Sequence, residues 1–305
     1  MKILVATDGS NYSQWACETV GRFAGPAQIT AYLVHVTTPI PEPTVPFPDV
    51  FMEGDLLFRE QIEKEHEVRA GERLEACRCM LPAGWQVIAE HRVGHPAAEV
   101  LASVRDHQPD LVVVGARGVD EAPIGGLGSV SQKVARYAPC SVLVAREAGT
   151  RFRHALVALD HGDDTRKVMD YLIEAPWLRE CTLTLAHVVE DRYLKESRVA
   201  ASQFKGSEAY LGRLQSALIQ DARMFLDEEA ARARESGLEV DTLVLEGDSA
   251  KVLQGRADSG GFDVMVMGSK GRTGLTHFLL GSTSQWLLRH TGTSVLLVRT
   301  RRAHS

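Results

Sequence analysis

The stretch GSKGRTGLTHFLLGS, from Gly268 to Ser282, carries the pattern G-x-x-G-x(9)-G-S. The same pattern occurs earlier in GARGVDEAPIGGLGS, from Gly115 to Ser129. A Walker-type phosphate loop would read G-x-x-x-x-G-K-[ST], and no window of the chain fits that motif. The chain therefore uses an unusual glycine spacing twice, and the role of these glycines without the lysine has to be explained.

Other segments repeat with the two glycine stretches. KILVATD, which ends at Asp8, resembles HALVALD, which ends 152 residues later at Asp160, and Val36 and Val188 are separated by the same distance. DLVVVGARG matches DVMVMGSKG, and APCSVLVAR matches TGTSVLLVR, each in the same order. Shared order and spacing indicate a duplicated domain. We predict domain 1 at residues 1–148 and domain 2 at residues 149–305.

Each half alternates β-rich apolar runs with segments of helical periodicity. Such alternation predicts an α/β fold in which a parallel sheet is covered by helices on both faces. In the first half the expected strands are 2–7, 29–36, 85–92, 110–114 and 141–146, and the expected helices follow Ser10 and span 55–80, 97–107 and 129–137. The proline-rich stretch 37–49 is expected to be a loop. Lys64, Glu65 and Arg69 are interpreted as part of a solvated helix face.

The composition bounds the class of protein. The chain has 305 residues, 44% of them hydrophobic and 24% charged, with a net charge of −6, which is typical of a globular protein and unfavourable for nucleic acid or an anionic membrane. No apolar run reaches the roughly 18 residues that a membrane span needs. The first residues enter a strand-like run without a secretory pattern, and five cysteines lack a framework spacing. We therefore expect a cytoplasmic protein with reduced thiols and without a metal or redox role for Cys77 and Cys79.

The position of the glycines suggests an anion site. Ligands of open α/β sheets bind beyond the carboxyl ends of the strands, where Asp8 and Gly115 are both expected. Glycine lets the backbone approach a ligand closely, and the helix that begins at Ser129 offers backbone N–H groups and its dipole to a phosphate. These donors would replace the Walker lysine. The alternative is that the glycines serve turns and the serine is only a helix cap.

Together these motifs resemble the universal stress protein family. The resemblance rests on G-x-x-G-x(9)-G-S, on V-x-x-D in the first strand of each half, and on SVLV and SVLL at 141–144 and 294–297, and it covers essentially the whole chain. It implies two tandem Rossmann-like domains, each with five parallel strands in the order 3-2-1-4-5, and ATP, with Mg²⁺ or Mn²⁺ carried by the nucleotide. The implied ATP-binding residues are Asp8, Val36, Gly115, Gly118, Gly128, Ser129 and Ser131 in the first half, and Asp160, Val188, Gly268, Gly271, Gly281, Ser282 and Ser284 in the second. No catalytic residue and no dedicated metal ligand is assigned.

The halves depart from the family pattern in different ways. The first has Asp120 and Glu121 in its glycine linker, and these acids would repel a triphosphate. The second has Lys270 and Arg272 there, but D-H-G-D replaces D-x-S after its first strand. The second half is therefore favoured as the tighter phosphate site.

Three functions stay open on the sequence. The first is a nucleotide-dependent stress-response sensor or switch with little or no hydrolysis. The second is a slow ATPase or autokinase, and the third is an adaptor for a non-nucleotide ligand or a protein partner. The resemblance also implies pairing through the fifth strands, 141–144 and 294–297, so the halves would form an intramolecular pseudo-dimer. Homodimerisation of the whole chain and the identity of a protein partner stay open.

Overall fold

The computed structural model describes residues 1–23, 28–40, 52–118, 126–147, 151–162, 164–190, 207–269 and 280–299. The described strands are β1 (Lys2–Ala6), β2 (Thr30–Thr37), β3 (Gln86–Val93), β4 (Leu111–Gly115), β5 (Ser141–Ala145), β6 (His154–Ala158), β7 (Thr182–Glu190), β8 (Glu239–Gly247), β9 (Val264–Gly268) and β10 (Ser294–Val298). The described helices are α1 (Asn11–Gly21), α2 (Met52–Cys79), α3 (Pro96–His107), α4 (Ser129–Tyr137), α5 (Asp164–Glu174), the 3-10 turn η2 (Pro176–Leu178), α7 (Ser207–Glu235), α8 (Ser249–Ser259) and α9 (Ser282–His290). The predicted alternation of strand and helix is confirmed in both halves.

All the described strands belong to one sheet of ten strands, in the order β3-β2-β1-β4-β5-β10-β9-β6-β7-β8. Read from its own first strand, each half has the order 3-2-1-4-5, and the pairings within each half are parallel. This order confirms the predicted fold class. The carboxyl ends of β1 and β4, and of β6 and β9, are neighbours, so each half has a point where the strand order reverses and a ligand site can form.

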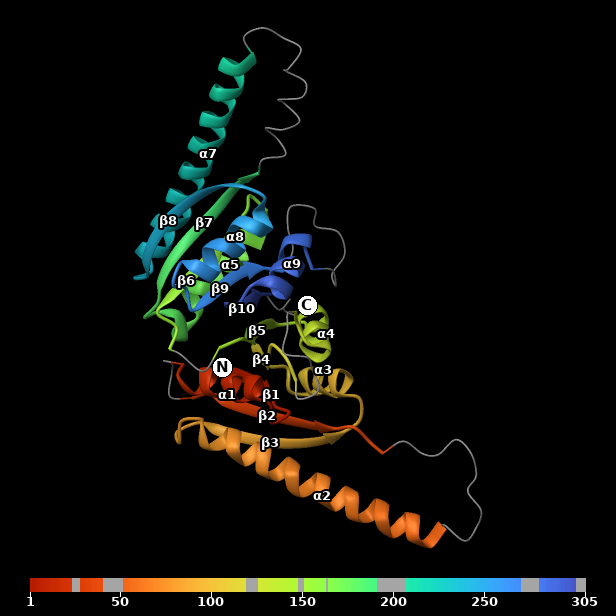
Figure 1. Cartoon of the computed structure of the whole chain (residues 1–305). Helices are drawn as coiled ribbons and strands as arrows, with labels where there is room; N and C mark the ends of the chain where they lie inside the picture. Colours follow the sequence, from red (N-terminus) through yellow and green to blue (C-terminus); the bar gives the residue numbers. More distant parts are fainter. Residues whose placement is uncertain are drawn as a thin grey trace.

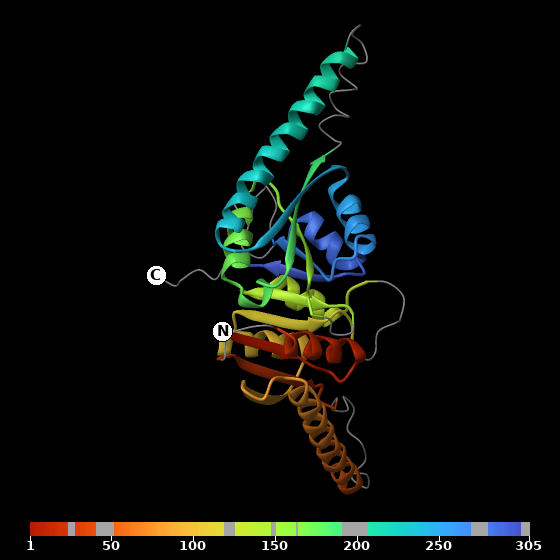
Figure 2. The same ribbon diagram turned by 90° about the vertical axis from the view of Figure 1, so that its left-hand side faces the viewer.

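The halves meet at β5 and β10, which lie next to each other in the middle of the sheet (Figure 1 and Figure 2). These strands are antiparallel, with Val144 opposite Val295 and Val142 opposite Leu297. The predicted pairing of the fifth strands is therefore confirmed, and it makes one continuous sheet rather than two separate ones. Because each strand covers the other, neither leaves an open edge.

Helices cover both faces of the sheet. One apolar cluster packs α1, α2, α5 and α7 against one face, and a second packs α3, α4, α8 and α9 against the other. Both clusters contain residues of the two halves. On the first face the contact between halves includes aromatic rings, because Phe23 stacks on Trp177 with ring centroids 4.4 Å apart and Phe152 lies 6.0 Å from Trp177. The two halves thus share a continuous core on each side.

The long helices α2 and α7 extend past the ends of the strands that they cover, at opposite ends of the molecule (Figure 1). The overhanging part of α2 exposes Leu57 and Phe58. The sequence places the start of the second helix at residue 55, and the structure begins it at Met52. The predicted proline-rich loop lies largely outside the described residues, as does the proposed domain boundary at 148 and 149, so that boundary stays a prediction. Within the described ranges, no helix has the length and apolar character to cross a membrane.

Cys17 of α1 and Cys77 of α2 form a disulfide. The expectation that all thiols are reduced is therefore wrong for this pair. It failed because the two cysteines lie 60 residues apart and become neighbours only when α1 and α2 pack side by side. Cys140 and Cys181 are buried and form no disulfide, whereas Cys79 is exposed on α2 and is also outside any disulfide.

Candidate functional site

A cavity of about 480 Å³ opens at the carboxyl ends of β6, β7 and β9 in the second half. Its volume lies within the range of about 300–1,000 Å³ that small-molecule sites occupy. Its lining includes six of the residues predicted for this half, namely Asp160, Val188, Gly268, Gly281, Ser282 and Ser284. The seventh, Gly271, lies outside the described residues together with Lys270 and Arg272. The structure thus brings the described part of the second predicted site to one cavity.

The first turn of α9 opens into this cavity. Gly281 is the N-cap residue, and among the described residues no side chain caps the helix there. Since the first N–H groups of a helix have no partner within it, this turn favours an anion. The hydroxyl of Ser284 donates to the carbonyl of Gly268 over 3.0 Å, and Ser131 donates in the same way to Gly115 over 2.5 Å. These hydroxyls hold the strand end to the helix, so each hydroxyl could donate to ATP only if its proton turned away from the carbonyl.

Gly268 and Gly115 have a packing role as well. A Cβ at Gly268 would lie 2.9 Å from the Cβ of Asp164 on α5, and one at Gly115 would lie 2.5 Å from the carbonyl carbon of Tyr12 on α1. Both distances are too short for real carbon atoms, so only glycine lets the helix come this close. The close approach of helix to strand explains both glycines without a ligand. The ATP-binding role that the family resemblance implies for them stays a prediction.

The loop after β6 turns around Asp160. Its Oδ1 accepts the backbone N–H of Gly162 over 3.0 Å, and its backbone carbonyl accepts the hydroxyl of Thr165. In the first half, Oδ1 of Asp8 accepts the N–H of Ser10 over 2.9 Å. Each carboxylate therefore stabilises the turn that follows its own strand.

The cavity also has walls that sequence reasoning missed. α7 contributes Leu218 and Asp221, the end of β7 contributes Glu190, and α8 contributes Ser249, whose hydroxyl donates to Glu190 over 2.9 Å. The internal repeat carried a signal for α7. The offset of 152 that relates the strand ends of the two halves also relates His66 and Arg69 on the first long helix to Leu218 and Asp221 of α7.

An aromatic group lies between α7 and the strand ends. Phe225 lies 4.3 Å from the ring of His161 and 5.5 Å from that of His187, measured between ring centroids. Nδ1 of His187 lies 2.9 Å from the carbonyl oxygen of Leu159, which makes this nitrogen the N–H donor. His161 also approaches Asp221, with 3.5 Å between Nε2 and Oδ2. These contacts attach α7 to the mouth of the cavity.

The predicted site of the first half is arranged differently. A Cβ at Gly118 would lie 2.7 Å from Oδ2 of Asp8, so the glycine loop lies against that carboxylate. Gly128 is the N-cap of α4 and donates its N–H to Ala116 over 2.8 Å, as Gly281 does to Ser269 over 3.0 Å. Ser129 opens α4. These residues therefore lie near the carboxyl ends of β1 and β4, and their predicted role in ATP binding stays a prediction.

The cavity to which Val36 contributes lies farther along the edge of the sheet. It measures about 260 Å³ and is lined by His35, Val36, Thr37, Thr38, His66, Arg69 and Arg73. Nδ1 of His35 lies 2.7 Å from the carbonyl oxygen of Thr7 and therefore carries the proton. Nε2 is then an acceptor, and it accepts a hydrogen bond from Nη1 of Arg73 over 3.3 Å. Burial lowers the pKa of His35, and the charge of Arg73 lowers it further, which keeps the ring neutral.

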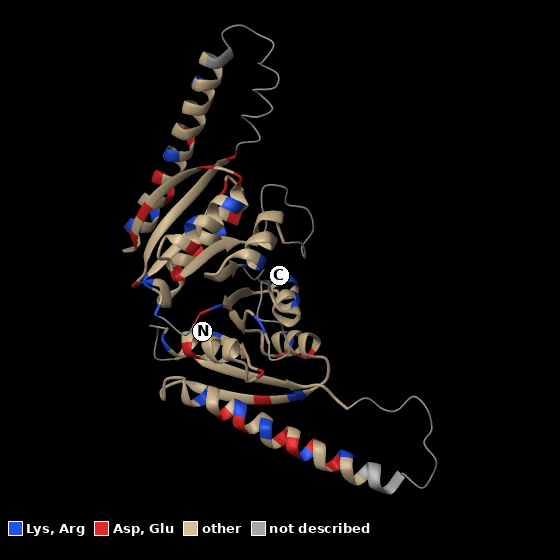
Figure 3. Ribbon diagram, viewed as in Figure 1, with Lys and Arg blue, Asp and Glu red and all other residues tan. Residues whose placement is uncertain are grey.

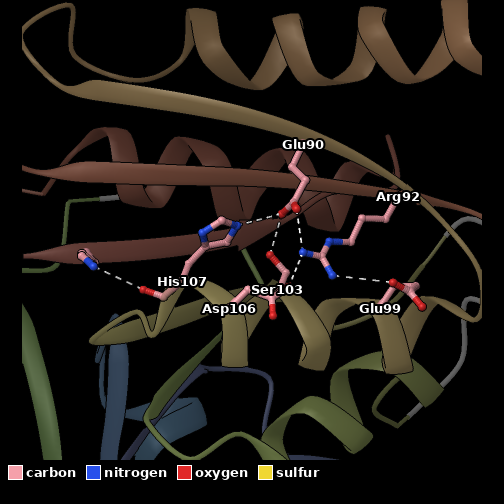
Figure 4. A network of polar contacts seen from close by, with 7 residues as sticks. Glu90, Arg92, Glu99, Ser103, Asp106 and His107 are labelled. Atoms are coloured by element: carbon pink, nitrogen blue, oxygen red, sulfur yellow. Dashed lines mark hydrogen bonds and ion pairs between the residues drawn. The ribbon is translucent and has the colours of Figure 1, made fainter.

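A separate polar network of the first half joins β3 to α3 (Figure 4). Arg92 binds Glu90 and Asp106, each over 2.6 Å, and Glu90 also accepts from Ser103 over 2.7 Å. Burial raises the pKa of Glu90, but the hydrogen bonds from Arg92, Ser103 and His107 outweigh it and hold the pKa below its usual value. This network braces the helix against the outer strand, and we assign it a structural role.

Comparison with known proteins agrees with the duplicated architecture. The model of the universal stress protein family matches residues 1–146 and again residues 151–299. The chain belongs to the universal stress protein family. Because the family model matches twice and each half has the complete strand order, the chain is a tandem universal stress protein, and the resemblance inferred from its motifs is confirmed.

Some relatives match one half of this chain, and others match its whole length. A universal stress protein of Thermus aquaticus is 30% identical over 145 residues, which cover 47% of this chain and 97% of that protein. One of Synechocystis is 20% identical over 312 residues, which cover 97% of this chain and 99% of the other. The crystal structure of a universal stress protein from Archaeoglobus fulgidus shares the fold over 98% of both chains, with a TM-score of 0.62 and 21% identity. Both single and tandem family members are thus among its relatives.

Proposed function

We propose that this universal stress protein is a regulatory protein that binds ATP in the cavity of its second half and acts as a nucleotide-dependent switch with little or no hydrolysis. The observation that carries the proposal is the cavity itself. It combines the start of α9, at Gly281 and Ser282, with apolar walls from residues such as Val188 and Leu218. A phosphate chain suits the helix start, and an adenine ring suits the apolar walls.

The charges of this cavity favour a nucleotide bound with a divalent cation. Asp160, Asp164, Glu190 and Asp221 all contribute to the lining. Carboxylates near a triphosphate are unfavourable unless positive charge offsets them. Mg²⁺ or Mn²⁺ carried by the nucleotide would supply it, since carboxylate and phosphate oxygens are the ligands that Mg²⁺ prefers. We therefore expect chelation of divalent cations to weaken ATP binding.

We favour binding without turnover because two of the carboxylates in the cavity already have partners within the protein. Phosphoryl transfer needs a positioned nucleophile and charge-stabilising cations. The carboxylate of Asp160 accepts the N–H of Gly162, and Asp164 forms an ion pair with Lys167 over 2.7 Å. Sustained release of ADP from Mg-ATP by the purified chain would replace the switch with the slow ATPase or autokinase alternative. If the purified chain binds no nucleotide, the remaining alternative is an adaptor for a non-nucleotide ligand or a protein partner.

The first experiment is to denature freshly purified protein and to identify any released nucleotide by chromatography and mass spectrometry, followed by calorimetric titration with Mg-ATP. We expect close to one adenine nucleotide per chain. Gly281→Leu should abolish the binding because the side chain would enter the space at the start of α9. The matched variant Gly128→Leu places the same change at the start of α4 and should leave the second-half affinity unchanged. Equal affinity of both variants and the natural chain would refute the assignment.

A further inference from the structure

The two long helices present opposite chemistry to equivalent cavities. The offset of 152 residues that relates Asp8 to Asp160 also relates three residues of α2 to three of α7. His66, Arg69 and Arg73 correspond in this way to Leu218, Asp221 and Phe225. The spatial contacts agree, because Arg73 contacts His35 just as Phe225 contacts the corresponding His187. Evolution of the duplicated chain has therefore left a cationic helix face in one half and an apolar and acidic one in the other.

We propose that the first half binds a second, different ligand, a small phosphorylated molecule held between the end of β2 and the cationic face of α2. This face consists of His66, Arg69 and Arg73, which line the cavity of about 260 Å³ together with His35 and the threonines at the end of β2. The proposal goes beyond nucleotide binding in the second half and does not depend on it.

Arg73 is held in place for this role. His35 is buried and fixed by its bond to the carbonyl of Thr7, so its Nε2 orients the guanidinium. The side chain of Arg73 also crosses Gly9, where a Cβ would lie 2.6 Å from Nε. Gly9 has a φ of +83°, which favours glycine in any case. The guanidinium therefore lies at the cavity with one N–H engaged, and the fork of donors that guanidinium groups offer to phosphate oxygens is preorganised.

Phosphate fits this lining better than a carboxylate does. A carboxylate is satisfied by a single bidentate arginine, whereas a phosphate has three terminal oxygens for donors that come from several directions. Here the donors come from two arginines of α2, from His66 and from the end of β2. The volume exceeds that of inorganic phosphate, which leaves room for a small organic group beside Val36.

The glycine loop of the same half does not favour a triphosphate. Gly118 lies against the carboxylate of Asp8, and the linker that follows carries Asp120 and Glu121 in its sequence. The described lining of the cavity at α2 includes two arginines and no carboxylate, whereas the linker sequence after Gly118 includes two acids. The two acids of the linker sequence would oppose a triphosphate at the loop, whereas the arginines of α2 would attract a phosphate in the cavity that they line.

Arg69 has a competing partner, because it binds Glu65 over 2.5 Å in an i,i+4 pair. Both side chains are more than half exposed, and such pairs contribute little to stability. Figure 3 shows that acidic and basic residues alternate along the ribbon of α2, so pairs of this kind are expected on this helix. A ligand phosphate would displace the carboxylate from Arg69. Glu65→Gln should therefore raise phosphate affinity by a few fold.

The test is a titration of the full chain with inorganic phosphate, pyrophosphate and glycerol 3-phosphate at constant ionic strength, followed by calorimetry and by the shift in Tm. It is done with Mg-ATP saturating the second half, and again in the Gly281→Leu background. We expect Arg69→Asp, which introduces the residue of the second half, to reduce affinity by roughly tenfold or more. The control Lys64→Asp makes the same charge reversal on an exposed position of α2 and should change affinity less than about twofold.

The outcomes separate the two sites. Phosphate binding that is lost with Arg69→Asp but persists in Gly281→Leu supports the proposal, even if ATP binding in the second half fails. Absence of binding in the natural chain, or equal losses with Arg69→Asp and Lys64→Asp, would overturn it. Loss of all phosphate binding in Gly281→Leu, with Arg69→Asp unaffected, would assign the anion to the second half instead.

Discussion

Arg146 and Arg299 make reciprocal hydrogen bonds between the two halves, each to backbone carbonyls of the opposite half. Arg146, at the end of β5, donates to the carbonyl of Leu288 near the end of α9, and Arg299, at the end of β10, donates to Ala138 over 2.6 Å and to Ala135 over 2.7 Å at the end of α4. Each arginine thus satisfies the last carbonyls of a helix in the opposite half. Because the two halves are duplicates, equivalent residues of each half make equivalent contacts to the other, and the interface has pseudo-twofold symmetry.

We expect Arg299→Met to destabilise the protein by about 2 kcal/mol, because hydrogen bonds from a charged group to buried carbonyls contribute about 1.5–3 kcal/mol. Burial lowers the pKa of Arg299, and it lowers that of Arg146 to about 10. Both arginines are half-buried at the contact between the halves. The free energy of unfolding in urea measures the loss. Arg213→Met, at an exposed position of α7, is the control, and an equal effect of the two variants would contradict the interface role.

The apolar wall at Leu218 gives a prediction for nucleotide affinity. Leu218→Trp should reduce ATP affinity about tenfold or more because the larger side chain takes up cavity volume, whereas Leu218→Ala should reduce it only a few fold. Calorimetric titration with Mg-ATP distinguishes the two. His66→Trp places the same ring at the corresponding position of the first half and should leave this affinity unchanged. An ATP site outside the second-half cavity would make all three variants equal.

The alternation of strands and helices could be predicted from local patterns and from a duplication that the sequence displays directly. The strand order and the pairing of β5 with β10 were expected only from the resemblance to the universal stress protein family, because neither can be read from local patterns. The sequence also located Asp160 and Gly281 at the cavity, since both lie at strand ends or helix starts. It could not identify the walls contributed by α7. Asp221 looks like any residue of a charged helix until the packing angle of that helix is known. For the same reason, Arg69 was interpreted as part of a solvated face, and its exposure agrees with that, although it also lines a cavity.

His35 gives a prediction for the dependence of stability on pH. Burial lowers its pKa from the ordinary value of 6.5, so the unfolded chain takes up a proton at a higher pH than the folded chain does. The free energy of unfolding should therefore fall as the pH is lowered through 6.5, until the pH reaches the lower pKa of the folded state, and His35 should contribute no slope well above 6.5. His35→Asn should flatten the profile between about pH 7 and 5. His95→Asn, at an exposed position, should keep the slope of the natural chain, and a His35→Asn profile of the same slope would contradict the argument.

The disulfide between Cys17 and Cys77 ties α1 to the helix that carries the cationic face. In the chain-entropy account, closing a loop of 60 residues stabilises the folded state by about 4 kcal/mol. Reduction should therefore lower the urea midpoint of the natural chain and leave that of a Cys17→Ala, Cys77→Ala double variant unchanged. Thiol titration of the unfolded, oxidised chain should find Cys79, Cys140 and Cys181, and in the folded chain Cys79 should react first because it is exposed. If all five cysteines titrate without reductant and reduction has no effect on the midpoint, the bond does not form in solution, and α1 and α2 are held by packing alone.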